Sequence, residues 1–117
     1  MGASRDLHQD IENALLGIEG AGKEAKGKLK ELGTALALLI QEPIDRNRDA
    51  FISSLSSVLI NPSSDTQINQ QVLNICKQHI DSTLDTQYKH RAALTLVKEQ
   101  VQQVEQEQQA QIGQRRK

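Results

Sequence analysis

Residues 25–40, AKGKLKELGTALALLI, hold the clearest pattern in this chain of 117 residues. Their apolar side chains recur at intervals of three or four positions, the period of an α-helix with one buried face. The stripe consists of Ala25, Leu29, Leu32, Leu36, Leu39 and Ile40. Gly27 and Gly33 each weaken such a helix by about 1 kcal/mol relative to alanine, but a glycine permits the close approach of a neighbouring helix. The segment therefore predicts a helix that buries one face in an aliphatic core.

The residues before this segment predict a first helix. Ser4 is placed to cap its start, and Gly17, Gly20 and Gly22 interrupt the pattern, which indicates a turn near 19–22. The apolar stripe consists of Leu7, Ile11, Ala14, Leu15 and Ile18.

Two further helices follow. Pro43 suits the first turn of a helix whose stripe is Ile44, Phe51, Leu55, Val58 and Leu59. Pro62 holds the residue before it in extended backbone, so residues 61–64 predict a loop. Asp65 is a plausible cap for a fourth helix, and residues 81–83 either break that helix or cap the next one. The stripe of the fourth helix is Ile68, Val72, Ile75, Cys76 and His79.

The last predicted helix, about 83–112, presents two apolar stripes on opposite sides. Leu84, Tyr88, Ala92 and Leu96 share one face, and the other face carries Ala93, Leu94, Val97, Val101, Val104 and Ile112. A helix that ends its own domain needs one stripe. The second stripe, with Gln108 in line, has the spacing of a short coiled-coil seam. A hairpin that folds back on its own bundle would also bury both stripes.

The composition favours a single all-α domain. Apolar residues make up 37% of the chain and aromatic residues 2%, so the core must be aliphatic. No segment shows the alternation of a β-strand. We predict a four- or five-helix, largely antiparallel bundle over residues 1–112, with a long last helix that projects, and a basic frayed tail over 113–117.

Two motifs invite a chemical interpretation. Residues 17–23, GIEGAGK, match the spacing of a phosphate-binding loop, but Glu24 follows where a hydroxyl is required and no strand precedes the motif. Cys76 and His79 lie three positions apart on one helix face, yet a structural zinc site requires about four ligands. We therefore interpret the first as an interhelical turn and the second as core packing, and we predict no metal, cofactor or catalytic residues.

Cysteine content and hydropathy indicate a cytoplasmic protein. Cys76 is the single cysteine, which suits a reducing compartment. The first ten residues lack the apolar core of a signal peptide, and the longest apolar run, residues 35–40, is too short to cross a bilayer. Export without a cleaved signal is the alternative.

The leading functional hypothesis is a non-enzymatic protein-interaction module: an adaptor, a small chaperone or an assembly subunit. It would pair with itself or with another helical protein through the second stripe of the last helix. The predicted partner-binding residues are Ala93, Leu94, Val97, Val101, Val104 and Gln108.

Two alternatives use charged groups. A membrane-surface protein or translocated effector would bind anionic lipid through the amphipathic segment 23–40 and its lysines, Lys23, Lys26, Lys28 and Lys30. A weak nucleic-acid binder would use these lysines and the tail Arg115, Arg116 and Lys117. The near balance of 14 basic and 15 acidic residues disfavours nucleic acid, because it leaves no dominant basic face.

Overall fold

The computed structural model describes the backbone of residues 3–60, 66–86 and 89–115, and the side chains of residues 7–60, 66–86 and 89–108. Within these ranges the chain forms five α-helices and no strand. They are α1 (Ala3–Leu16), α2 (Lys23–Gln41), α3 (Asp45–Leu59), α4 (Thr66–Thr86) and α5 (Arg91–Arg115). The predicted all-α bundle is confirmed.

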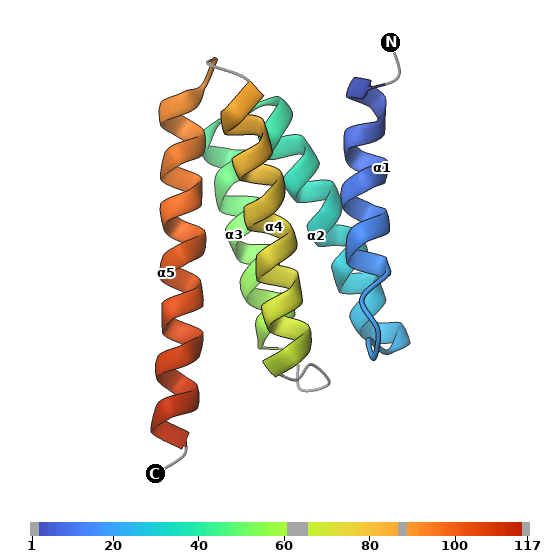
Figure 1. Ribbon diagram of the computed structural model, residues 1–117, viewed down its shortest axis with the longest axis vertical. Coiled ribbons are helices and arrows are strands. Elements are labelled where there is room, and N and C mark those ends of the chain that lie inside the picture. Colours follow the sequence, from blue (N-terminus) through green and yellow to red (C-terminus); the bar gives the residue numbers. More distant parts are fainter. Residues whose placement is uncertain (1–2, 61–65, 87–88, 116–117) are drawn as a thin grey trace.

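Consecutive helices run in opposite directions, and α1 and α5 stand on opposite sides of the bundle (Figure 1). The main contacts are those of α2 with α1 and α3, and of α4 with α5. Smaller contacts join α4 to α1 and α2, and α5 to α3. The hairpin of α4 and α5 thus closes over the three-helix unit formed by α1, α2 and α3.

The core is aliphatic and centred on the face of α2 that the sequence predicts. All six stripe residues of α2 are buried, together with Gly33 and Ala37. Phe51 of α3 is fully buried among these aliphatic side chains. Gly33 lies against α1, where an added Cβ would be 3.5 Å from Leu15 Cδ1 and 3.6 Å from the Cα of Glu12. α1 therefore packs directly over Gly33, at a distance where a Cβ would make ordinary van der Waals contact, whereas Gly27 faces open space.

Side chains from neighbouring elements donate to carbonyl groups at three helix ends, where the regular hydrogen bonds of the helix run out. Asn47 is buried and its amide donates to the Glu42 carbonyl at the end of α2, over 2.8 Å. The Asn69 amide donates to the Leu59 carbonyl at the end of α3, over 3.1 Å. The Arg91 guanidinium donates to the Leu84 carbonyl near the end of α4, over 2.9 Å.

The sequence places the boundary between the last two helices wrongly. Residues 81–83 neither break α4 nor start α5, because Thr83 is buried and its hydroxyl donates to the His79 carbonyl inside the helix, over 2.9 Å. α4 ends at Thr86, and α5 begins at Arg91 rather than near 83 and ends at Arg115 rather than 112. His90, directly before α5, has φ 63°, a left-handed conformation that costs a non-glycine residue about 1 kcal/mol.

This boundary divides the first of the two stripes that the sequence assigns to one helix. Leu84 belongs to α4 and is buried, whereas Ala92 and Leu96 belong to α5 and are exposed.

The structure also differs from the sequence-based expectations at other helix starts. Ser4 lies inside α1 instead of preceding it, and Ile44 is an exposed residue at the start of α3. The predicted cap Asp65 and the stripe residue Tyr88 lie outside the described residues.

We predict opposite effects at the two glycines of α2. Gly27→Ala raises the free energy of unfolding by about 1 kcal/mol, because alanine favours a helix and nothing crowds its Cβ. Gly33→Leu lowers it by about 2 kcal/mol, because the larger side chain overlaps α1. Urea denaturation followed by circular dichroism measures both. Equal effects of the two substitutions would contradict the close contact of α1 and α2 at Gly33.

Candidate interaction surface

The seam predicted to bind a partner lies largely inside the chain's own core. Leu94, Val97 and Val101 are 0%, 1% and 0% exposed. Ala93 is half-buried, Val104 packs partly against the core and Gln108 is half-buried. The expectation of an exposed seam is therefore wrong for Leu94, Val97 and Val101. The chain reverses direction before α5, so this face turns inward and packs against α3 and α4.

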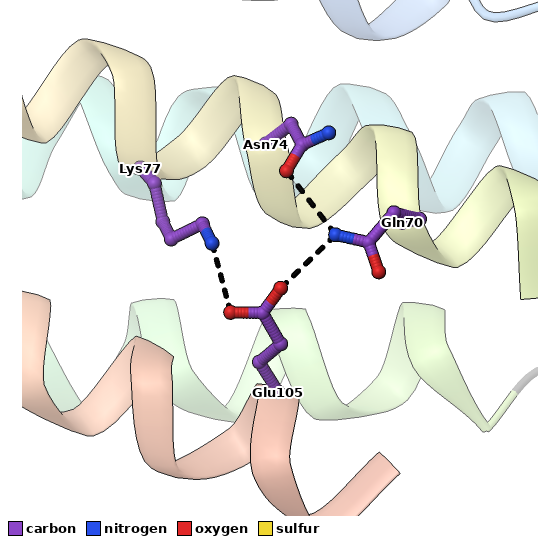
Figure 2. Close-up of polar contacts among 4 residues, drawn as sticks. All are labelled: Gln70, Asn74, Lys77 and Glu105. Atoms are coloured by element: carbon purple, nitrogen blue, oxygen red, sulfur yellow. Dashed lines mark hydrogen bonds and ion pairs between the residues drawn. The ribbon is translucent and has the colours of Figure 1, made fainter. Parts of the chain in front are cut away.

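Glu105 of α5 forms the centre of a polar cluster at the edge of the seam (Figure 2). Its Oε1 atom lies 2.8 Å from the Nζ atom of Lys77, and its Oε2 atom accepts a hydrogen bond from Gln70 Nε2 over 3.0 Å. Gln70 Nε2 also donates to Asn74 Oδ1 over 3.2 Å. Gln70, Asn74 and Lys77 lie on α4, whereas Glu105 lies on α5. The cluster therefore joins the two helices of the hairpin.

The cluster changes the acidity of Glu105. The hydrogen bond from Lys77 and the one from Gln70 lower the pKa of the Glu105 carboxyl, and together they outweigh the opposing effect of burial. The side chain is 16% exposed, so the ion pair is shielded from much of the solvent. Such a pair is stronger than one on an open surface.

Two further contacts extend the α4–α5 interface toward the reversal. Lys98 Nζ lies 2.7 Å from Asp81 Oδ1, and the Arg91 guanidinium donates to the Leu84 carbonyl. One cost opposes them: Gln100 Oε1 is buried and has no hydrogen-bond partner among the described residues. A buried acceptor without a donor costs about 1–3 kcal/mol. A short apolar seam therefore holds α5 against its neighbours, together with the polar pairs along the edge of that seam.

Sequence reasoning missed these polar contacts. Lys77, Asp81, Lys98 and Glu105 border the apolar stripes of α4 and α5, which is where charged residues set the pairing of two helices in a coiled coil. This signal was present in the sequence. The pairs themselves require the antiparallel register, which depends on where the chain reverses.

The outer face of α5 is open over its described side chains. Leu96 is 40% exposed, and Glu99, Gln103 and Gln106 on the same face are exposed. With 25 residues, α5 is longer than α4, which has 21. Its last turns extend past the ends of α3 and α4 (Figure 1).

Cys76 and His79 lie on α4, directed toward the interior. Cys76 is fully buried in the core, and burial raises the pKa of its thiol to about 12. His79 is half-buried. Burial lowers the pKa of its imidazole, and the Asp10 carboxylate partly opposes this effect. Over the described residues no three His, Cys, Asp or Glu side chains gather in a way that could hold a metal ion. Cys76 packs as a small apolar residue.

The four lysines of the alternative hypotheses all lie on α2. Lys23, Lys26 and Lys30 are exposed on α2, whereas Lys28 is half-buried and donates to Ser57 Oγ over 3.1 Å. The apolar stripe beside these lysines faces the core. The side chains of Arg115, Arg116 and Lys117 lie outside those described.

The glycine-rich segment forms the turn between α1 and α2, as its interpretation as an interhelical turn predicts. It borders an open surface hollow of about 420 Å³, lined by Gly17, Glu19, Gly20, Gln67, Ile68 and Gln71. Glu19 places a carboxylate at this hollow, which disfavours phosphate. The preceding element is the helix α1 rather than a strand, so the context of a phosphate-binding loop is missing.

The fold and the α4–α5 interface define an all-α bundle closed by a helical hairpin. Comparisons with protein-family models, curated proteins and solved structures find no match to this chain. Among the described residues, no helix combines the length and the apolar character needed to span a bilayer.

We predict that Glu105→Gln lowers the free energy of unfolding at neutral pH by about 1–2 kcal/mol, because it removes the ion pair with Lys77. A carboxyl whose folded pKa is lowered stabilises the fold above its unfolded pKa and loses this effect as pH falls through the folded pKa. The difference between wild type and variant therefore shrinks from neutral pH toward about pH 3. Urea denaturation at several pH values measures it.

Glu99→Gln is the matched control, because Glu99 is exposed on the same helix. It should leave the stability within about 0.5 kcal/mol of wild type at every pH. Equal behaviour of the two variants would show that the Glu105 cluster contributes nothing to the α4–α5 interface.

We predict that the Cys76 thiol resists labelling in the folded protein. Its burial and raised pKa mean that the thiolate forms only when the core opens. Reaction with a chromogenic disulfide reagent at about pH 8 should be at least about a thousandfold slower than in denaturant. Fast labelling without denaturant would contradict the packed core around α4.

Proposed function

We propose that this chain is a non-enzymatic helical protein-interaction module, of the adaptor, small-chaperone or assembly-subunit class, and that α5 is its binding element. One observation carries the proposal: α5 extends past the ends of the helices that pack against it (Figure 1). A helix with open faces beyond its own bundle offers a partner the i, i+3, i+4 spacing that helix pairing requires.

The arrangement of α5 divides the predicted partner-binding residues into two groups. Leu94, Val97 and Val101 are used by the chain's own core. Val104 and Gln108 are half-buried and lie closer to the extending end. The proposed contact therefore centres on these two residues.

The surroundings of this contact suit pairing with a protein rather than with lipid. Gln102, Gln103, Gln106 and Glu107 are exposed around Val104 and Gln108. Val104 continues the buried apolar seam, and polar side chains beside such a residue are typical of the border of a coiled-coil seam. We also assign the module to the cytoplasm, because its one cysteine is buried as a free thiol, which suits a reducing compartment.

Site-specific photo-crosslinking tests this function. A photoreactive amino acid replaces Val104 in the full chain, and a second version carries it at Ser53 on the exposed part of α3. After irradiation in cells that make the protein, adducts are separated by size and identified by mass. We expect a defined protein adduct from position 104 and none from position 53.

Cross-links from position 104 that stay within one chain would overturn the proposal, provided that circular dichroism shows an intact helical fold. Equal adducts from both positions would mean nonspecific contact and would also overturn it.

A further inference from the structure

The connection between α4 and α5 is unusual for a helix reversal. The sequence from 63 to 112 contains neither glycine nor proline, although these residues commonly end a helix and start a turn. His90 adopts the left-handed conformation instead, with φ 63°. The local sequence therefore favours continuation of the helix, as the prediction of one helix over 83–112 indicates.

The reversal is imposed by packing. It brings Leu94, Val97 and Val101 into the core, and it pairs Glu105 with Lys77 and Lys98 with Asp81. None of these contacts requires that α4 and α5 belong to the same chain. The α5 helix of a second copy can pack into the same groove between α3 and α4, because its side chains are identical.

We propose that the partner of this module is a second copy of the chain, and that the two copies exchange their α5 helices. In the exchanged dimer α4 and α5 join as one long helix, and each α5 occupies the α3–α4 groove of the other copy. This inference goes beyond the proposed function: it keeps α5 as the binding element but places the contact with the partner in the seam of Leu94, Val97 and Val101.

The energetic difference between the two states lies at the reversal. Exchange retains the seam and the ion pairs, and it relieves the left-handed conformation of His90 twice per dimer. It gives up the Arg91 contact with the Leu84 carbonyl, which a continuous helix supplies with its own donor. Loss of independent motion of two chains opposes exchange, so the dimer grows with concentration.

Charge reversal at the Lys77–Glu105 pair tests exchange directly. In Lys77→Glu alone and in Glu105→Lys alone, like charges face each other in every monomer and in every homodimer. When the two variants are mixed, only an exchanged heterodimer restores opposite charges at both interfaces. We expect size-exclusion chromatography with light scattering to give a 1:1 complex with twice the 13.0 kDa mass of one chain. The double variant Lys77→Glu/Glu105→Lys, with its pair restored in each copy, should behave as wild type.

His90 supplies an independent test that leaves the interface intact. His90→Gly favours the left-handed turn and should lower the dimer fraction on the order of tenfold at a fixed concentration of about 10 µM. His90→Val disfavours the turn and should raise it. Lys89→Val is the matched control, because His90 is the one described non-glycine residue with positive φ.

The outcomes separate this inference from the proposed function. If mixing leaves both charge variants at the mass of one chain, and the His90 variants match wild type up to about 100 µM, exchange is overturned. A position-104 crosslink to a different protein would then still support the interaction module. A crosslink between two copies together with no heterodimer on mixing would indicate association without exchange and would also overturn it.

Discussion

Burial of the aliphatic face of α2 is the interaction on which the rest of the bundle depends. α2 packs against α1, α3 and α4, and its buried leucines and isoleucine contribute about 1.5–3 kcal/mol each. Phe51 is the largest of the fully buried side chains, so cohesion comes from many medium-sized contacts. α1 packs over Gly33 and shares this core through Ile11 and Leu15.

α5 is held in a different way. Three buried aliphatic residues anchor it, and the Glu105 cluster and the Lys98–Asp81 pair border them. Its neighbours α3 and α4 end before it does (Figure 1). The helix that closes the bundle is thus also the one that extends beyond it (Figure 1). The residues that hold α5 in the bundle and the residues proposed for recognition lie at different positions along this helix.

Periodicity predicted the elements of the fold well. The stripes of α2, α3 and α4 are buried with few exceptions, such as the exposed Ile44. The turn at 17–22 and the free, buried Cys76 also follow the expectations from sequence. Prediction failed at the last helix, because the residues between Thr86 and Arg91 carry no local signal for a reversal. The Lys77–Glu105 contact joins helices whose register depends on that reversal, so sequence reasoning could not identify it.

The sequence by itself determined that the chain is all-α, that its core is aliphatic, and which face of most helices is buried. Spacing along a helix is a local property, so it specifies these features without knowledge of neighbours. The tertiary structure alone decided what covers each face. Leu94, Val97 and Val101 form a seam in any helix, but burial by the same chain requires that α4 and α5 fold back on each other. That choice arises from long-range packing energy, which overrides a local preference for helix at His90.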